Sequence, residues 1–220
     1  APKAKPAPKA KPAPKAKPVT KVAVNLSQSL FNKNVTDEFQ KELNSSDDIY
    51  LYLPWILHQG DALVKEISND ERYKIQKFDI IKADIYDHDV RRKISAYVKD
   101  NQSEYLNIVL SRLISIRSKV KGFLLTFDWA PVMRTIVQAC QILEIPTILI
   151  PHESVFANED KYYLDITAKA SMPQADFILG WGDLQKRIFK ERGYDVENRF
   201  ESVGAIKFDQ YFNYKNQLTR

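Results

Sequence analysis

The chain has 220 residues, of which 33 are basic and 28 acidic, so its formal net charge is +5. Seven of the basic residues lie in residues 1–21, which contain no acidic residue; 26 basic and 28 acidic residues remain, so the rest of the chain has a net charge of −2. A hydrophobic content of 44% excludes a wholly disordered chain. The single cysteine excludes an internal disulfide framework and a four-cysteine zinc site, and no apolar run reaches the roughly 18 residues of a membrane-spanning helix.

Residues 1–18 repeat the hexapeptide Ala-Pro-Lys-Ala-Lys-Pro three times. Proline removes backbone hydrogen-bond donors and the lysines repel one another, so residues 1–21 are predicted to form an extended, disordered, low-complexity linker. The alternative is an electrostatic tether to an anionic membrane or polymer. No aromatic residue alternates with the lysines, so the tail offers no platform for stacked bases and we expect no specific nucleic-acid partner.

The body of the chain, residues 22–209, is predicted to alternate between strands and helices. A short apolar run over Ile49–Leu53 predicts a strand, and apolar residues with helical spacing follow over Trp55–Ile67. A second strand is predicted over Ile75–Ala83, and one or two helices over Asp87–Ser118.

The clearest unit follows. Apolar runs over Gly122–Thr126 and Thr147–Ile150 predict two buried strands, and Val132–Leu143 between them has helical spacing after a proline. Strand, helix and strand within about 30 residues indicate a βαβ unit with parallel strands. The pattern repeats with a strand over Phe177–Leu179, a helix over Leu184–Arg192 and a strand over Glu201–Val203. The predicted fold class is therefore α/β, with a doubly wound, mostly parallel, Rossmann-like sheet.

Polar or glycine-rich loops follow four consecutive predicted strands. They are Phe127–Ala130, Pro151–Ser154, Gly180–Asp183 and Gly204–Asp209. Ligands of such sheets bind outside the carboxyl ends of the strands, and these ends lie at one edge of a parallel sheet. We therefore expect the candidate site at this edge.

His152 and Glu153 are adjacent at one of these strand ends. A histidine there can act as a general base toward an acceptor hydroxyl or donate to a developing phosphate charge, and the neighbouring carboxylate can hold acceptor hydroxyls. The same pair could instead only cap the following turn, and the residues alone do not decide between the two.

The other strand-end residues have two interpretations each. Asp128 could bind a sugar hydroxyl or cap the following helix, and the cap is favoured. Gly180 and Gly182 could admit a ligand to the backbone, or make the turn before a helix capped by Asp183, and the turn is favoured. Lys207 could bind phosphate or be solvated.

Three further residues are weaker candidates. Asp87 beside His88 is expected to be a helix N-cap next to a solvated histidine rather than part of a metal site. His58 lies near another strand end and could face the same cleft. Cys140 falls on the apolar face of its helix, which predicts a core residue.

Four segments within residues 124–209 carry a family resemblance. In chain order they are LLTFDWAP, EIPTILIPHES, ADFILGWGDLQKRIFKERGY and ESVGAIKFD. Together they resemble the motifs of bacterial surface-polysaccharide transferases of the GT-B type, which have two Rossmann domains. Within that group the chain is most similar to capsule-synthesis proteins, including those like Kdo transferases, and to CDP-glycerol glycerophosphotransferases.

The resemblance implies that His152 matches the family's histidine in the acceptor-side cleft, where it would be a catalytic base or a phosphate contact. Glu153 stands where the family usually has glycine, and would supply a carboxylate to the same catalytic pair. The positions expected to bind substrate are Asp128, Ser154, Gly182, Asp183, Gly204 and Lys207.

The resemblance also implies a donor, an acceptor and a missing partner domain. The donor would be a nucleotide-activated sugar or CDP-glycerol, with no metal and no other cofactor, and the acceptor a saccharide or lipid-linked molecule. In the family the donor nucleotide binds mainly to a C-terminal domain, so residues 210–220 are expected to begin a linker toward a donor domain that this chain lacks.

The expected function is therefore the acceptor-side half of a glycosyltransferase or glycerophosphotransferase for capsule or other cell-envelope polysaccharides. It would be cytoplasmic, or peripheral at the inner face of the cell membrane, and inactive alone if residue 220 is the true end. The alternative is a non-catalytic binding or scaffold module with a degenerate transferase fold, tethered by residues 1–21.

Overall fold

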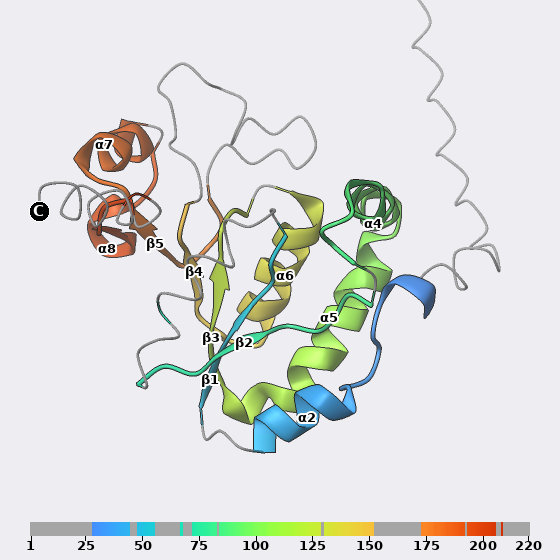
Figure 1. The fold of residues 1–220 in the computed structure, drawn as a ribbon. Coiled ribbons are helices and arrows are strands. Elements are labelled where there is room, and N and C mark those ends of the chain that lie inside the picture. Colours follow the sequence, from blue (N-terminus) through green and yellow to red (C-terminus); the bar gives the residue numbers. More distant parts are fainter. Residues whose placement is uncertain are drawn as a thin grey trace, which may run out of the picture.

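A computed structural model describes residues 28–44, 48–55, 67, 72–82, 84–128, 130–151, 173–191, 193–205 and 208. Within these ranges the chain forms a six-stranded sheet in the order β2-β1-β3-β4-β5-β6, and every neighbouring pair of strands is parallel (Figure 1). The predicted α/β, Rossmann-like, doubly wound fold is confirmed. The linkers expected over residues 1–21 and 210–220, and most of the helix expected over Trp55–Ile67, lie outside the described residues.

The strands agree closely with prediction, with one exception. They are β1 Ile49–Tyr52, β2 Ile75–Lys77, β3 Val120–Leu125, β4 Thr147–Leu149, β5 Phe177–Gly180 and β6 Phe200–Ser202. The exception is β2, which was predicted to reach Ala83 but ends at Lys77. The chain turns at Asp79 and Ile80, and Ile81 then forms an isolated antiparallel bridge with Phe31. Apolar residues continue past the turn because they pack in the core, not because the strand continues.

The helices are α2 Asp37–Asn44, α4 His88–Asp100, α5 Gln102–Ile116, α6 Pro131–Ile142, α7 Asp183–Glu191 and the short α8 Val196–Arg199, with a 3₁₀ turn at Arg117–Lys119. The region predicted as one or two helices is two, divided at Asn101. Asp87 caps α4 as predicted, because its carboxylate accepts hydrogen bonds from the amides of Asp89 (2.7 Å) and Val90 (3.2 Å). Helices α2 and α8 were not predicted. None of the helices in the described ranges has both the length and the apolar character needed to cross a membrane.

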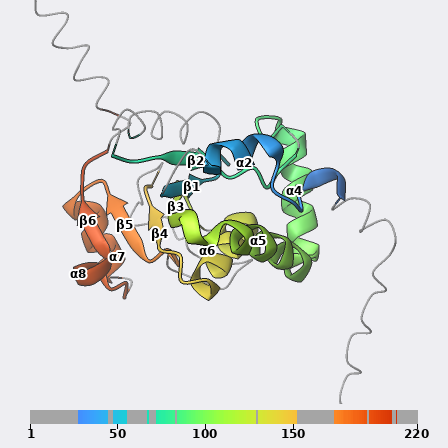
Figure 2. The ribbon, with the colours of Figure 1, turned by 90° about the horizontal axis from the view of Figure 1, so that it is seen from below.

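The main core lies between the sheet and helices α4, α5 and α6, which pack against one another on one side of it (Figure 1). The strands contribute alternate residues to this core: Ile49 and Leu51 of β1 are fully buried, whereas Tyr50 and Tyr52 between them are half-buried. Cys140 of α6 is buried in this core, as predicted. Helices α7 and α8 lie beside β5 and β6 at the other end of the sheet (Figures 1 and 2).

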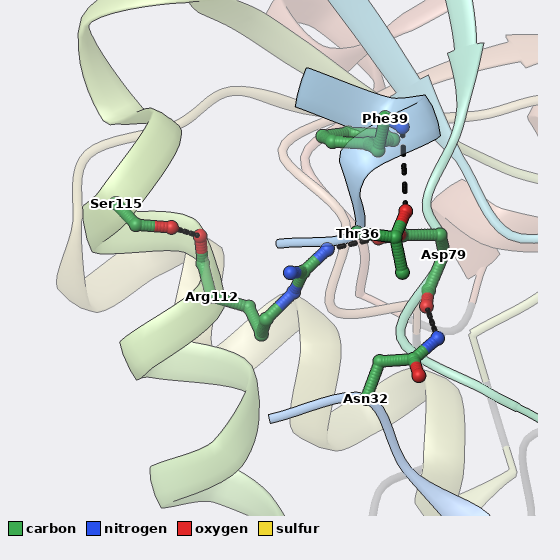
Figure 3. A network of polar contacts seen from close by, with 6 residues as sticks. All are labelled: Asn32, Thr36, Phe39, Asp79, Arg112 and Ser115. Carbon is green, nitrogen blue, oxygen red and sulfur yellow. Dashed lines mark hydrogen bonds and ion pairs between the residues drawn. The ribbon is translucent and has the colours of Figure 1, made fainter. Parts of the chain in front are cut away.

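Residues 28–44, called the N-terminal arm below, pack on the end of β2 and on α5. Buried Arg112 of α5 forms an ion pair with Asp79, and the hydroxyl of Thr36 in the arm donates to the same carboxylate at 2.5 Å (Figure 3). The guanidinium also lies 5.6 Å from the ring centre of Phe39, so the arm closes around the pair.

The direction of the chain through the sheet changes once. From β1 it moves to β2 on one side, and then from β3 to β6 on the other. The switch point of the topology, where ligands of such sheets commonly bind, therefore lies between the carboxyl ends of β1 and β3. The candidate loops after β3 and β4 begin at this point or next to it.

Candidate functional site

The structure brings the starts of the four predicted loops to one edge of the sheet. Asp128 follows β3, Pro151 follows β4, Gly182 follows β5 and Gly204 follows β6, and all four strands are parallel. His152, Glu153, Ser154 and Lys207 lie outside the described residues, as does His58, so their roles stay predictions.

Asp128 is fully buried, and its carboxylate bonds to the protein itself. Its Oδ2 accepts hydrogen bonds from the backbone amides of Gln174 (2.5 Å) and Ala175 (3.0 Å), just before β5. The interpretation as a helix cap was wrong, because the N-cap of α6 is Ala130 and no side chain bonds there. The favoured interpretation failed because the amides that Asp128 binds are 46 and 47 residues away in sequence.

The electrostatic environment of Asp128 is unusual for a carboxylate. Burial raises the pKa of Asp128, and the two amides and the nearby charge of Arg134 only partly oppose this shift. The second oxygen, Oδ1, has no hydrogen-bond partner among the residues that the structure describes. Whether it binds a substrate hydroxyl remains a prediction.

Residues 174–176, called the lead-in segment below, are held on several sides. The carboxylate of Asp176 accepts from both the amide (2.8 Å) and the hydroxyl (2.7 Å) of Thr147 at the start of β4. The same hydroxyl accepts from the amide of Asp176 (2.9 Å). These bonds tie the first residue of β4 to the residue before β5.

The carbonyl groups of the lead-in segment are bonded as well. The hydroxyl of Tyr194 donates to the carbonyl of Ala175 (3.2 Å), and the guanidinium of Arg199 donates to the carbonyls of Ala175 and of Asp176. The side-chain amide of Gln141 donates to the carbonyl of Gln174 (3.0 Å). With the bonds to Asp128, every backbone amide and carbonyl of the three residues has a hydrogen-bond partner, so the segment is held in place by the protein on all of its polar groups.

The chain is also held in place at the end of β4. The indole nitrogen of Trp181 donates to the carbonyl of Pro151 at 2.8 Å. The indole also packs edge-on against the ring of Phe208, with 5.7 Å between the ring centres. The amide of Trp181 donates in turn to the side chain of Gln185 in α7 (2.8 Å). Trp181 thus links the residue that precedes His152 to the end of β5.

Gly180, the last residue of β5, and Gly182, which follows the strand, serve the fold in two ways. A Cβ at Gly180 would lie 1.9 Å from the ring of Phe200, so the close neighbour at this position is a side chain of β6. The carbonyl of Gly182 accepts a hydrogen bond from the amide of Lys186 (3.0 Å), which is the first hydrogen bond of α7. Gly182 is therefore the residue immediately before the helix. The predicted turn is therefore present, but Asp183 is the first helical residue and not the cap.

Asp183 and Gly204 remain available at the surface of this edge. Both residues are exposed, and the hydroxyl of Ser202 lies 3.3 Å from Asp183 Oδ1. Gly204 has a φ of +88°, a conformation that favours glycine. These positions are compatible with substrate contact, and their predicted roles are not tested by the geometry.

Sequence reasoning missed the side chains that make these contacts, both at the carboxyl edge and at the starts of β4 and β5: Gln141, Thr147, Asp176, Trp181, Tyr194 and Arg199. Asp176 and Trp181 were noticed only as parts of a motif. The sequence did contain a signal for one of these contacts. Thr147 begins one predicted strand and Asp176 directly precedes the next, so a hydrogen bond between the two side chains could have been predicted.

The weaker candidate at residues 87–89 lies at the start of α4. His88 and Asp89 are exposed, and Nδ1 of His88 lies 3.9 Å from Oδ1 of Asp89. Among the described residues, no three His, Cys, Asp or Glu side chains are grouped to hold a metal ion.

No protein-family model matches the chain, and no curated protein matches it.

Proposed function

We propose that this chain is the acceptor-side domain of a glycosyltransferase or glycerophosphotransferase that builds a bacterial surface polysaccharide. The observation that carries the proposal is the convergence of four loops on one carboxyl edge of a parallel sheet, beside its switch point. The four motifs that resemble the family supply these loops. Fold alone would not support the assignment, because Rossmann-like sheets host many chemistries.

The proposed reaction is a direct displacement. An acceptor hydroxyl attacks the activated carbon or phosphorus of a nucleotide-linked donor; the new C–O or P–O bond forms as the bond to the leaving nucleotide breaks. His152, directly after Pro151, would take the proton of the hydroxyl or contact the donor phosphate. Glu153 and Ser154 would hold the acceptor, with Asp183, Gly204 and Lys207 at the neighbouring strand ends.

The acceptor would be a saccharide or a lipid-linked saccharide at the inner face of the cell membrane. Residues 1–21, with seven lysines and no acidic residue, would add a salt-sensitive contact with an anionic membrane or polymer. The donor nucleotide would bind largely on a second domain.

A transfer assay on the full-length protein tests the proposal. CDP-glycerol or a CMP- or UDP-activated sugar would serve as donor, and release of the nucleotide would be measured. Loss of a general base costs about 100-fold or more in rate, so H152A should lose at least that much. The matched control is H88A, whose imidazole is exposed on α4, and it should leave the rate unchanged. Full activity in H152A would exclude the assigned role of His152.

A non-catalytic binding module is the second candidate. One observation favours it: the side chains of Asp128 and Trp181 at this edge form hydrogen bonds with the protein's own backbone. Saccharide binding measured by calorimetry, without nucleotide binding or nucleotide release by the full-length protein, would support the module and exclude the transferase.

A further inference from the structure

Apolar side chains are exposed where β5 and β6 end at the carboxyl edge of the sheet. Leu184, Val203 and Phe208 are 63%, 43% and 44% exposed, and each lies no more than six residues beyond the end of one of these strands. The two strand ends are joined, because the amide of Val203 donates to the carbonyl of Gly180 at 2.9 Å. Exposed apolar residues that gather at one place commonly mark a binding site, and ligands of parallel sheets bind at this edge.

The ring of Phe208 is supported by the ring of Trp181. The planes of the two rings meet at 73°, with 5.7 Å between their centres. Trp181 is held at two points, since its indole nitrogen donates to the carbonyl of Pro151 and its amide to the side chain of Gln185. Phe208 therefore presents a partly exposed ring on a preorganised support, which lowers the entropic cost of covering it with a ligand.

Groups that can bind hydroxyls lie at the same two strand ends. Asp183 follows Trp181 by two residues, and the hydroxyl of Ser202 at the end of β6 donates to its Oδ1 at 3.3 Å. Within the described part of the chain, Oδ2 of Asp183 receives no hydrogen bond. A Cβ at Gly182 or Gly204 would meet none of the described atoms within 4 Å, so no side chain covers the surface at these two positions.

The charges near these strand ends favour a neutral ligand over a phosphate. The basic residues of α7 already form ion pairs: Lys186 and Lys190 with Glu197, and Arg187 with Glu191. A phosphate would be repelled by the carboxylate of Asp183. Hydroxyl groups would instead donate to this carboxylate, and the apolar C–H face of a sugar ring would cover Phe208.

We propose that Trp181, Asp183 and Phe208 form a saccharide-binding site. Phe208 stacks against the apolar face of one sugar ring, Trp181 supports Phe208, and Asp183 accepts hydrogen bonds from the sugar hydroxyls. The identification of this sugar as part of the acceptor rests on the proposed function. Binding itself does not require transfer.

Indole NMR of the whole 220-residue chain measures binding at this site. The chain has three tryptophans, so isotope-labelled protein gives three indole N–H cross-peaks, assignable with W55F, W129F and W181F. The probes are the methyl glycosides of glucose, galactose and N-acetylglucosamine. They are titrated to about 50 mM, because a single sugar ring bound with ordinary efficiency has a Kd of about 2 mM. The control probes are sorbitol, which has hydroxyls but no ring, and CMP.

The expected result is a saturable shift of the Trp181 cross-peak with at least one methyl glycoside. The cross-peak of Trp55, which is buried after β1, stays in place, and neither control probe has an effect. F208A removes the apolar ring surface and weakens binding about fivefold or more. D183A removes a charged acceptor and weakens binding about tenfold. The matched control is F177A, since Phe177 is 47% exposed but lies at the start of β5, and it leaves the Kd unchanged.

Several results would overturn the proposal. They are the absence of a Trp181 shift with all three glycosides, an equal shift with sorbitol or CMP, and an equal loss of affinity in F177A and F208A. A shift that follows protein concentration but not sugar would assign the exposed apolar residues to self-association and would overturn it as well.

The same titration separates this site from the proposed function. Sugar binding that F208A weakens, without nucleotide release in the transfer assay, would reject the transferase and leave the saccharide site established. Nucleotide release by a protein whose Trp181 cross-peak does not respond to sugar would reject the site and leave the transferase.

Discussion

Two carboxylates, half-buried Asp79 after β2 and fully buried Asp128 after β3, are stabilised in different ways. Asp79 meets a full positive charge, the guanidinium of Arg112, and it also accepts from Thr36 (Figure 3). Asp128 meets two backbone amides, with the charge of Arg134 only nearby. The side chain of Asp79 is 20% exposed, whereas Asp128 is 0% exposed.

The different partners of the two carboxylates indicate different contributions to stability. At Asp79 the negative charge is required, because Arg112 is buried and its Nε and Nη1 have no hydrogen-bond partner in the described part of the chain. Burial lowers the pKa of Arg112, and Asp79 opposes that shift. At Asp128 the bonds need an oxygen acceptor, and a neutral group could supply it. We therefore expect the site at Asp79 to depend on charge and the site at Asp128 to depend on the geometry of its hydrogen bonds.

The largest expected effect is at Asp79. D79A would leave the guanidinium of Arg112 buried without its counter-ion, and breaking a buried ion pair in this way costs about 3–5 kcal/mol. The free energy of unfolding is measured by urea denaturation. D89A is the matched control, since Asp89 is exposed on α4 and its replacement should change stability by less than about 0.5 kcal/mol. A loss at D79A no greater than in the control would mean that the charge of Asp79 is not required.

The second expected effect is at Asp128. D128A removes the acceptor of two buried amides, and leaving such donors unsatisfied costs about 1–3 kcal/mol. Urea denaturation again gives the value, and D128N, which can keep both bonds, is the control. Equal losses in D128A and D128N would show that the charge matters at this site too, and the contrast with Asp79 would disappear.

Much of the fold could be predicted because its signals are local. The unit from β3 to β4 combines two continuous apolar strands with a helix that begins at Pro131, and each feature is set by neighbouring residues. The end of β2 was misplaced because apolar residues continue beyond the turn at Asp79. The pattern of apolar residues indicates which residues are buried, and here buried residues continue beyond the end of β2.

The contacts of the two carboxylates are not local, and they were harder to predict. Arg112 did carry a signal, because it lies on the helical face of Tyr105, Val109 and Ile116, which are buried, so an arginine there requires a buried partner. Nothing in the spacing indicates that Asp128 binds amides 46 and 47 residues away, because that pairing depends on how the β4–β5 connection returns. The edge that would hold a site was therefore predictable, but the side chains that organise it were not.

A smaller effect is expected at Tyr194, which tests the geometric site without touching its charge. Y194F removes the hydroxyl that donates to the carbonyl of Ala175, and one hydrogen bond contributes about 1 kcal/mol. The ring contacts with Phe189 and Arg199 are kept. The corresponding change in the arm is T36V, which removes the hydroxyl bonded to Asp79. Because that bond is to a charged group, T36V should cost more than Y194F in urea denaturation; the reverse order would contradict the distinction between the sites.

The smallest effect at neutral pH is expected for D128N, and its sign separates the two sites most sharply. Burial raises the pKa of Asp128 above its ordinary 3.8, so the folded chain binds this proton more tightly than the unfolded chain does. The stabilisation from this proton is fully present below pH 3.8 and is lost as the pH rises through the raised value. D128N should therefore remove a decline in stability above pH 3.8, and at neutral pH it should be as stable as the unmodified protein or more so. Urea midpoints measured from pH 4 to 8 test this, with Y194F as a variant in the same region that should keep the decline. If D128N is less stable at neutral pH and the decline is unchanged, the negative charge of Asp128 stabilises the fold, as that of Asp79 does.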